Sequence, residues 1–312
     1  MFEFDLEGVP RDWRVAHIPK PNKPGEFRKI TIPNDELKEV QRGILTESLY
    51  KCPALKPSKF AFGFVPYRST LDAVMQHDPE ADFFCMDAKD FFDTFPVPVV
   101  RQQLLKGGLD ADYVDKLLEA CSYKGTIPQG SPASPCLTNI GMKEVDAMLS
   151  AFAKSLGLTY TRYADDIVMS INWDAKGIPR KNIGVRVFKG VDKLLQETLG
   201  IRLKKSKCHV MPYKGKAKRQ ILGITISDDA QGYNAPRRLR RQARAQCCNL
   251  YRKLKAQRGH PSNEDWKAWA ELKGTIQYLD ACRSRNVNPT ADPIIQEEFW
   301  NYLEARFAKC RN

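Results

Sequence analysis

The sequence lacks the features that mark membrane-spanning, secreted and zinc-binding proteins. No run of about eighteen apolar residues occurs in its 312 residues, so no membrane-spanning helix is expected. The opening residues, MFEFDLEGVPRDWR, contain no continuous apolar core, which argues against a signal peptide and favours a cytoplasmic location. The nine cysteines form no Cys-x-x-Cys pair and the four histidines do not cluster with them, so we expect reduced thiols and no zinc site.

Acidic residues are the scarcer charged class, and the basic excess is unevenly spread. Lys and Arg number 50 against 37 Asp and Glu, which gives a formal net charge of +13. The segment 204–255 is densely basic. Cations that neutralise phosphates release counterions, so this bias favours a polyanionic partner such as nucleic acid. A solvated basic face is the simpler alternative, and a membrane surface fits less well because Trp and Phe are not arranged opposite the charges.

Hydrophobic periodicity predicts an α+β chain with no internal repeat. Turn residues at 21–25 separate two short β-forming runs, which predicts a β-hairpin over residues 12–33. Asn34 is a typical N-cap, and apolar residues recur at helical spacing from there to about Tyr50. The same criteria predict further strands at 83–87, 159–163, 167–171, 201–203 and 221–227, and helices at 97–106, 110–121, 135–156, 185–199, 236–257, 263–284 and 293–309.

Two adjacent aspartates stand between apolar, β-forming segments. Asp165 and Asp166 separate the predicted strands 159–163 and 167–171, so both carboxylates are expected at the tip of a hairpin. Aspartate is common in turns, and an ordinary Asp-containing turn is the simplest alternative. The apolar flanks argue against it, because two adjacent buried carboxylates repel each other unless a cation neutralises them. A divalent metal ion does so.

A third aspartate, Asp87, ends the predicted buried strand 83–87. If this strand neighbours the hairpin in one sheet, three carboxylates converge on one point. Such a set suits magnesium, a hard cation that prefers oxygen ligands. Two ions held there can activate a 3′-hydroxyl, clamp the transferring phosphoryl group and stabilise the leaving pyrophosphate. Asp90 and Asp93 are weaker candidates, better explained as local caps or solvent-facing charges.

Three segments together resemble the catalytic motifs of reverse transcriptases. Tyr163-Ala164-Asp165-Asp166 resembles motif C of that family, and Asp87 with Phe91-Phe92 resembles motif A. Pro128-Gln129-Gly130-Ser131-Pro132 resembles motif B. The order and spacing of the motifs make the resemblance specific, and it runs from about Lys20 to Ser227. It implies a right-hand polymerase fold with fingers, a palm made of a small antiparallel sheet and helices, and a helical thumb.

The resemblance also implies domain boundaries and metal ligands. Residues 1–82 are expected to form the N-terminal part of the fingers, 83–215 the palm with a fingers segment at about 97–127, and 216–312 the thumb and C-terminal helical region. The implied catalytic residues are Asp87, Asp165 and Asp166, and the implied ligands of two Mg²⁺ ions, for which Mn²⁺ can substitute, are these three with Ala88.

Five further positions acquire nucleotide-binding roles by this resemblance. Lys20 and Arg28 resemble fingers residues that grip the incoming triphosphate, although without the resemblance they would be exposed hairpin charges. Phe92 resembles a bulky residue that packs under the sugar and excludes a 2′-hydroxyl, which implies deoxynucleotide substrates; otherwise it would be a core aromatic. Gln129 resembles a residue of the loop that orients template and primer, and Lys207 a lysine that can protonate pyrophosphate.

An RNA template and an RNA–DNA duplex are the implied macromolecular ligands. Glycine in the motif B loop lets the backbone approach nucleic acid closely. Arginines at helical spacing in the expected thumb put several cations on one face, where they can track the phosphates of a duplex. The implied nucleic-acid-binding residues are Gly130, Tyr163, Arg237, Arg238, Arg241 and Arg244.

Within the family, the sequence most resembles retron-type enzymes of bacteria. Ala61-Phe62-Gly63-Phe64 fits that group, as does Lys273-Gly274 near the C-terminus. Two boxes depart from the retron pattern: residues 73–77 keep only an alanine and a histidine of the usual box, and Ile221-Leu222-Gly223 is closer to the group II intron pattern. The resemblance implies an RNA-directed DNA polymerase that uses dNTPs, makes a branched RNA–DNA from a cognate structured noncoding RNA and acts in phage defence, with a toxin or effector protein as a candidate partner.

Other functions stay open from the sequence. The chain could be another domesticated bacterial reverse transcriptase, either defence-associated or group II-like. A palm-fold polymerase that uses NTPs or no template is a second possibility, and Phe92 argues against NTP use. A non-catalytic RNA-binding subunit is a third, and it would require the three aspartates to have lost their role.

Overall fold

The computed structural model describes residues 4, 8–19, 25–177, 179, 182–215, 218–226, 233–257, 260–284 and 296–309. These residues belong to two units, Met1–Pro212 and Tyr213–Asn312. The predicted boundary between palm and thumb lay at 215/216, close to this division. The assignment of fingers, palm and thumb stays a prediction.

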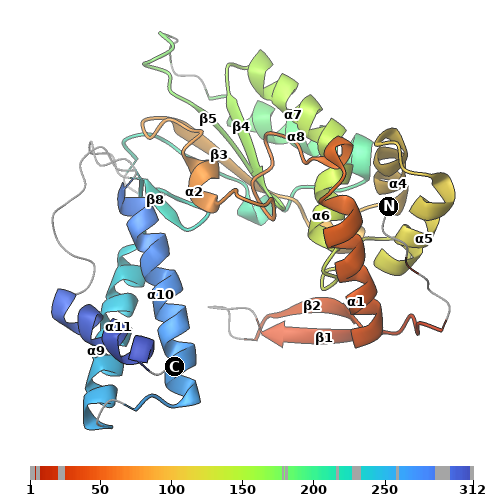
Figure 1. The fold of residues 1–312 in the computed structure, drawn as a ribbon. Helices are drawn as coiled ribbons and strands as arrows, with labels where there is room; N and C mark the ends of the chain where they lie inside the picture. Colours follow the sequence, from red (N-terminus) through yellow and green to blue (C-terminus); the bar gives the residue numbers. More distant parts are fainter. Residues whose placement is uncertain are drawn as a thin grey trace. The chain divides into compact units, whose positions relative to one another are not determined.

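The first unit contains a four-stranded antiparallel sheet (Figure 1). Its order is β4-β5-β3-β6, so the hairpin β4–β5 lies beside the earlier strand β3. The strands are β3 (Asp82–Asp87), β4 (Thr159–Tyr163), β5 (Asp166–Ile171) and β6 (His209–Met211). The predicted adjacency of the strand 83–87 and the hairpin is present in this order.

Helices α7 (Lys143–Ser155) and α8 (Gly184–Leu199) cover one face of this sheet (Figure 1). Because side chains alternate along a strand, Phe84 and Met169 point into the main hydrophobic core on this face. Phe84 meets Phe188 of α8 edge to face, with ring centroids 6.5 Å apart. Apolar side chains on both faces explain why the strand 83–87 reads as a continuous apolar run rather than an alternating one.

His77 lies on the opposite face of the sheet, beyond the short helix α2 (Thr70–Val74). Its imidazole is hydrogen-bonded to the hydroxyls of Ser170 (2.6 Å) and Thr161 (2.7 Å). Burial lowers the pKa of His77 to about 3, so the ring is neutral at physiological pH. The histidine of the incomplete retron box therefore links two strands of the sheet in this chain.

The N-terminal hairpin and the helix after it follow the prediction closely. Strands β1 (Trp13–Pro19) and β2 (Phe27–Pro33) pair antiparallel, and α1 (Asp35–Gly43) starts behind the Asn34 cap, whose side chain accepts a hydrogen bond from the Leu37 amide at 2.8 Å. The helix continues as a π-helical segment, Ile44–Leu49. The remaining helices of this unit are Pro53–Leu55 (η2), α3 (Phe91–Thr94), α4 (Val97–Lys106), α5 (Ala111–Cys121), α6 (Ser134–Gly141) and Lys205–Lys207 (η3).

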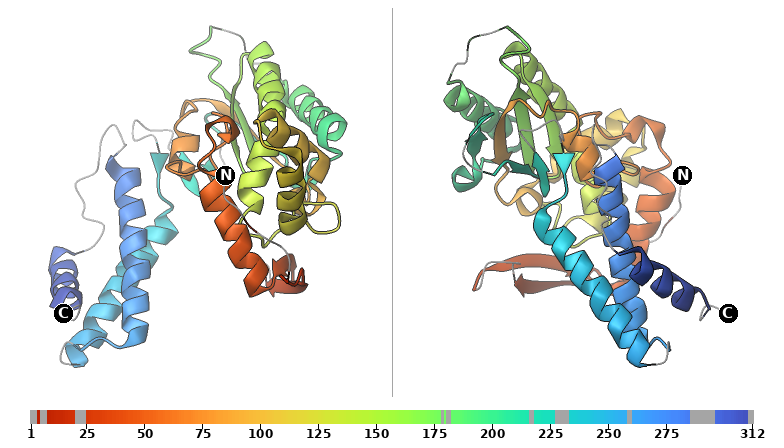
Figure 2. Two further views of the ribbon diagram at one scale, coloured as in Figure 1. Left: turned by 45° about the vertical axis from the view of Figure 1, so that its right-hand side comes forward. Right: turned by 90° about the vertical axis from the view of Figure 1, so that its left-hand side faces the viewer.

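The second unit combines a small three-stranded sheet with helices. Helices α9 (Arg237–Ala256) and α10 (Asn263–Ser284) lie side by side (Figure 2), and α11 (Glu297–Lys309) packs against α9. Aromatic rings add to this packing, since Trp269 of α10 stacks on Phe307 of α11 with centroids 5.0 Å apart. The strands are β7 (Gln220–Ile221), β8 (Ile224–Ile226) and β9 (Tyr233–Asn234).

Three predicted elements differ in the structure. The single helix expected at 135–156 is two, because Met142 (ψ −8°) ends α6 and caps α7. The strand expected at 201–203 is reduced to one bridge between Leu203 and Ala88. The strand expected at 221–227 is a hairpin, since left-handed backbone at Leu222 and Gly223 turns the chain between β7 and β8.

The ends of two predicted elements, Ser227 and residues 293–295, lie outside the described residues. Among the helices that the structure describes, none has both the length and the apolar character needed to cross a lipid bilayer.

Candidate active site

Strand pairing brings the three predicted aspartates together. Asp87, the last residue of β3, lies directly opposite Asp166, the first residue of β5. Side chains of directly paired residues have Cβ atoms about 5 Å apart. The Ala88 amide donates a hydrogen bond to the Asp165 carbonyl at 2.9 Å, which ties the end of β3 to the hairpin turn. The turn is tight because Ala164 adopts a left-handed conformation, with φ +55°.

A cavity of about 580 Å³ opens at this end of the sheet. Most of the residues predicted to bind metal or nucleotide line it, whereas Asp166, Gly130 and Tyr163 do not. Lys20 lies outside the described residues, and the four predicted arginines of α9 belong to the second unit. The predicted residues in the lining are Arg28, Asp87, Ala88, Phe92, Gln129, Asp165 and Lys207, and the lining also contains Asp90, Asp93, Phe64 and Lys204.

The aspartates at this end of the sheet raise one another's pKa values. Burial, together with the negative charges of Asp165 and Asp87, raises the pKa of Asp166 to about 7. Burial and the charge of Asp87 also raise the pKa of Asp165, while Lys207 and Arg28 act in the opposite direction. The site therefore holds more negative charge than its surroundings neutralise.

Lys207 is the cation closest to this charge. Its ammonium group donates a hydrogen bond to Asp87, whose side chain is 6% exposed, whereas that of Lys207 is 51% exposed. Partial burial alone would lower the pKa of Lys207, but the hydrogen bond and the charge of Asp87 outweigh it and raise the pKa. Lys207 is therefore protonated at neutral pH.

The donor set fits an oxygen-loving divalent cation. Three carboxylates with uncompensated charge are the ligands that Mg²⁺ prefers, and carbonyl oxygens such as that of Ala88 are of the same type. Within the described residues, no three His, Cys, Asp or Glu side chains gather tightly around one metal position. The ammonium group of Lys207 occupies one oxygen of the Asp87 carboxylate.

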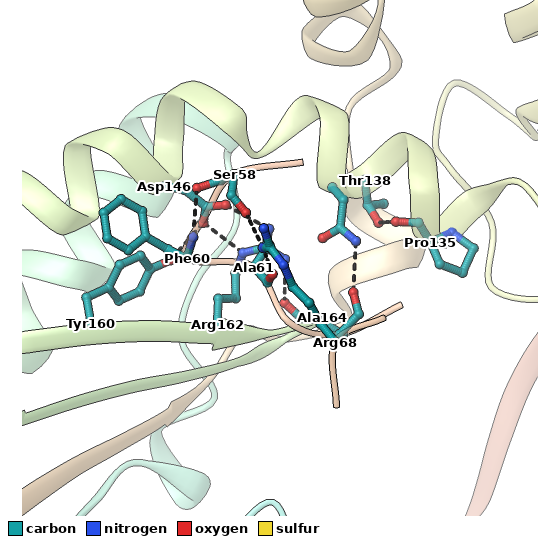
Figure 3. Close-up of polar contacts among 12 residues, drawn as sticks. Ser58, Phe60, Ala61, Arg68, Pro135, Thr138, Asp146, Tyr160, Arg162 and Ala164 are labelled. Carbon is teal, nitrogen blue, oxygen red and sulfur yellow. Dashed lines mark hydrogen bonds and ion pairs between the residues drawn. The ribbon is translucent and has the colours of Figure 1, made fainter. Parts of the chain in front are cut away.

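A buried ion pair between β4 and α7 lies next to the aspartate turn (Figure 3). Arg162 of β4 donates two hydrogen bonds to the carboxylate of Asp146 on α7, at 2.8 and 2.9 Å. The Tyr160 hydroxyl donates a further bond to Asp146 at 2.8 Å. Arg162 also donates to the carbonyl of Ala164 at 3.1 Å, one residue before Asp165. The guanidinium thus fixes the backbone of the turn.

The segment 58–64 runs along the outer edge of β4. The Phe62 amide donates to the Arg162 carbonyl and the Arg162 amide donates to the Phe60 carbonyl, both at 2.8 Å. At Gly63 a Cβ atom would lie 2.5 Å from the Ala164 amide nitrogen, so only glycine fits against the turn. The Gly63 residue of the retron-like box therefore serves close packing against motif C.

The N-terminal hairpin is joined to the motif B loop at the cavity. The Thr31 amide of β2 donates to the Gln129 carbonyl at 2.7 Å. Gly130 has φ +127°, and a Cβ there would lie 2.5 Å from the Thr31 carbonyl oxygen. This contact holds β2, which carries Arg28, beside Gln129. In the structure Gly130 is required by backbone packing, and its predicted contact with nucleic acid stays a prediction.

Arg162 and Phe64 were not predicted as site residues. Arg162 reads as an exposed β-strand charge in the sequence, and its only signal is the unusual position of an arginine inside an apolar strand. Phe64 reads as a core aromatic, yet it is 54% exposed and lines the cavity.

We expect Arg162→Met to lower the free energy of unfolding by about 3–5 kcal/mol, because it leaves the buried Asp146 carboxylate without its cation. Urea unfolding of both proteins measures the change. Arg101→Met is the matched control, since Arg101 forms a solvent-exposed pair with Asp115 in the same unit and should have little effect. Equal losses in the two variants would contradict a supporting role for the Arg162 pair.

Asp166 should make stability fall as pH rises. A carboxyl group whose pKa is raised in the folded state binds its proton more tightly there than in the unfolded chain, so its contribution is lost between about pH 4 and pH 7. Asp166→Asn removes this loss. In metal-free buffer, the stability of the variant relative to the parent should therefore increase from pH 4 to pH 7, as measured by urea unfolding. A difference that does not vary with pH would refute the raised pKa.

Comparison with known proteins agrees with these motifs. The model of the reverse transcriptase (RNA-dependent DNA polymerase) family matches residues 18–226. Similar curated relatives include the retron Mx162 reverse transcriptase of Myxococcus xanthus, 31% identical over 83% of this chain and 56% of that protein. Another is the retron Ec86 reverse transcriptase of Escherichia coli, 29% identical over 70% of this chain and 65% of that protein. The chain thus spans between about half and two thirds of the length of these relatives.

A solved structure supports the architecture. Apo telomerase from Candida tropicalis matches 98% of this chain and 63% of its own, with a TM-score of 0.52 and 12% sequence identity. At this identity the likeness concerns the fold alone, and it confirms the predicted α+β polymerase fold. The predicted resemblance to retron-type enzymes is also confirmed, and the chain belongs to the reverse transcriptase family.

Proposed function

We propose that this protein is an RNA-directed DNA polymerase, which extends a primer with dNTPs along an RNA template. The observation that carries the proposal is the cavity where Asp87 and Asp165 meet the cations Arg28 and Lys207. Carboxylates for metal ions and fixed cations for a triphosphate are the two requirements of nucleotidyl transfer. Membership of the reverse transcriptase family supports the same activity.

In this proposal, Asp87, Asp165, Asp166 and the Ala88 carbonyl hold two Mg²⁺ ions, for which Mn²⁺ can substitute. When bound, the ions lower the pKa of the primer hydroxyl and neutralise charge on the phosphates. The protein supplies the rigid placement of these oxygens, because the β3–β5 register and the Arg162 bond to Ala164 fix the backbone on both sides.

The cavity cations and Phe92 act on the nucleotide itself. Arg28 on β2 is placed to bind the triphosphate, a role that the sequence also gives to Lys20. Lys207, which carries its proton at neutral pH, gives that proton to the departing pyrophosphate. Phe92 packs under the sugar and excludes a 2′-hydroxyl, and Gln129 lies on the same wall, where it orients the nucleotide against the template.

Helix α9 binds the template–primer duplex through phosphates. Its twenty residues, Arg237–Ala256, include no Asp or Glu, and Arg237, Arg238, Arg241 and Arg244 are exposed. The helical positions of Arg237, Arg241 and Arg244 fall on one face. A duplex near A-form is recognised by shape and backbone, so these contacts are independent of sequence. Gly130 and Tyr163 contact the nucleic acid near the cavity.

The retron resemblance extends the proposal to a biological substrate. A structured noncoding RNA is proposed to provide the template and a priming 2′-hydroxyl, which gives a branched RNA–DNA product. A role in phage defence, together with a toxin or effector protein, belongs to the same proposal. Sequencing of the nucleic acid that copurifies with the protein tests it, and the absence of any specific RNA would argue for another reverse transcriptase type.

We expect Asp165→Asn to abolish dNTP incorporation on an RNA template, since it removes one ligand charge at the cavity while keeping the size of the side chain. Primer extension measures the effect. Asp115→Asn is the control, because Asp115 is an exposed aspartate outside the cavity lining, and it should retain activity.

A second readout separates metal binding from folding. Mg²⁺ should raise the melting temperature of the parent protein, because a ligand that binds only the folded state stabilises it. The Asp165→Asn variant should lose most of this rise. A protein that binds RNA but incorporates no nucleotide with any divalent metal would be a non-catalytic RNA-binding subunit instead.

Arg241→Gln should weaken binding to an RNA–DNA duplex similarly for all sequences. It should also reduce the slope of log affinity against log salt by about 1, because one phosphate contact is lost. Fluorescence anisotropy over a salt series measures the slope. Lys267→Gln, an exposed cation on α10 of the same unit, should leave the slope unchanged if the α9 face is the binding surface.

A further inference from the structure

Phe64 combines three properties that rarely occur together. Its backbone is left-handed (φ +57°), its side chain is 54% exposed, and its ring lines the cavity beside Asp165. A left-handed conformation is a genuine outlier for a bulky residue. Such a conformation persists only where the surroundings determine it, and it is found most often where a function needs it. An exposed aromatic ring gains little from burial, so packing alone does not explain this conformation.

The residues before Phe64 are fixed from one side by the sheet and by α6. Segment 60–62 is hydrogen-bonded to Arg162 of β4 through two backbone bonds of 2.8 Å. The Asn139 side chain on α6 donates to the Gly63 carbonyl at 2.9 Å and is itself buried. Gly63 lies against the Ala164 amide with no room for a Cβ atom. The contact between Gly63 and Ala164 of motif C therefore determines the direction of the backbone at Phe64.

Arg68 closes the loop from its other end (Figure 3). Its guanidinium donates to the Ser58 carbonyl at 2.8 Å and to the Ala61 carbonyl at 2.5 Å. It also lies over the Phe62 ring, 5.6 Å from the centroid. The loop 58–68 is thus bonded to itself as well as to the sheet, so the position of Phe64 is fixed at both ends.

The ring of Phe64 meets the residue that the proposed function assigns to sugar discrimination. It contacts Phe92 edge to face, with centroids 6.5 Å apart and an interplanar angle of 75°. It also meets Tyr163 of motif C at 6.4 Å. Phe92 also meets the buried ring of Phe91 at 5.4 Å. Phe92 therefore contacts both a core aromatic ring and the exposed ring of Phe64.

We propose that Phe64 is a positioning residue for sugar selection, which holds the Phe92 ring where it excludes a 2′-hydroxyl. The proposal rests on the proposed polymerase function and deepens it. Phe91 is rigid because it is buried, so it limits the motion of Phe92 toward the core. Among the ring contacts of Phe92 found within the described residues, Phe64 is the exposed partner, and it lines the cavity with Phe92. Without Phe64, the Phe92 side chain gains rotamer freedom, and space opens for a ribose hydroxyl.

Phe64→Gly tests this role without a folding penalty from the backbone. Glycine removes the ring and adopts a left-handed conformation readily, whereas alanine at this position would retain the strain. The measurement is kcat/KM for dATP and for ATP on one RNA template with one primer. We expect the ratio of dATP to ATP efficiency to fall by roughly tenfold, chiefly through faster use of ATP. Phe64→Tyr keeps the ring and should keep the ratio.

Tyr67→Gly is the matched control. Tyr67 is in the same loop, has a left-handed backbone (φ +63°) and is fully exposed, but it does not line the cavity. Its replacement should leave the ratio unchanged. A ratio that changes equally in Phe64→Gly and Tyr67→Gly would overturn the proposal, because it would reflect loop flexibility rather than the ring.

The double variant Phe64→Gly/Phe92→Ala tests whether Phe64 acts through Phe92. If it does, the double variant discriminates no worse than Phe92→Ala alone, since coupled residues are not additive. Additive losses, or a Phe64→Gly ratio within about threefold of the parent, would overturn the positioning role while the polymerase function stands. Failure of the unaltered protein to incorporate any nucleotide would overturn the proposed function and this proposal together.

Discussion

Antiparallel pairing of β3 with β5 is the constraint on which the site depends. It sets Asp87 opposite Asp166 and leaves Asp165 at the turn, so the three aspartates lie at one end of the sheet. Six consecutive residue pairs, from Asp82 opposite Ile171 to Asp87 opposite Asp166, define this register, and Phe84 and Met86 anchor β3 in the main hydrophobic core. The core therefore enforces a concentration of negative charge that the carboxylates alone would oppose. Raised pKa values at Asp165 and Asp166 are the direct result.

Holding like charges together requires support that the sheet alone does not give. The Arg162–Asp146 pair supplies it from inside the unit, with both side chains almost fully buried. A buried ion pair adds little net stability over apolar residues, because both charges lose their hydration. It does impose one geometry, since a guanidinium that bonds Asp146 and the Ala164 carbonyl together has a single orientation. Precision of the turn, rather than stability, explains why charges are buried here.

The sequence predicted those parts of this arrangement in which the local residue pattern also determines the position in three dimensions. Strand 83–87 ends in Asp87, and strands 159–163 and 167–171 flank Asp165 and Asp166, so the convergence of the three aspartates followed from one assumption about a shared sheet. The hairpin at Leu222 depends on a left-handed backbone that ordinary residues seldom adopt, and the helix break at Met142 has no proline to mark it, so neither could be predicted from the residue pattern. The burial of Arg162 could not be predicted, because its partner Asp146 is on a helix whose packing face is known only in three dimensions.

The turn at Ala164-Asp165 contacts residues that lie far apart in the sequence and have separate proposed functions. The Ala164 carbonyl of this turn accepts a hydrogen bond from Arg162, the Ala164 amide nitrogen lies against Gly63, and Asp165 lines the cavity. Through Gly63 the same turn sets the direction of Phe64, whose ring reaches Phe92. In the proposed function, metal binding and sugar selection therefore depend on the same turn, so a displacement of the turn would move both sites. This contact gives a physical reason for the glycine in Ala61-Phe62-Gly63-Phe64. The Cβ atom of any larger residue would push Phe64 away from the turn that carries Asp165.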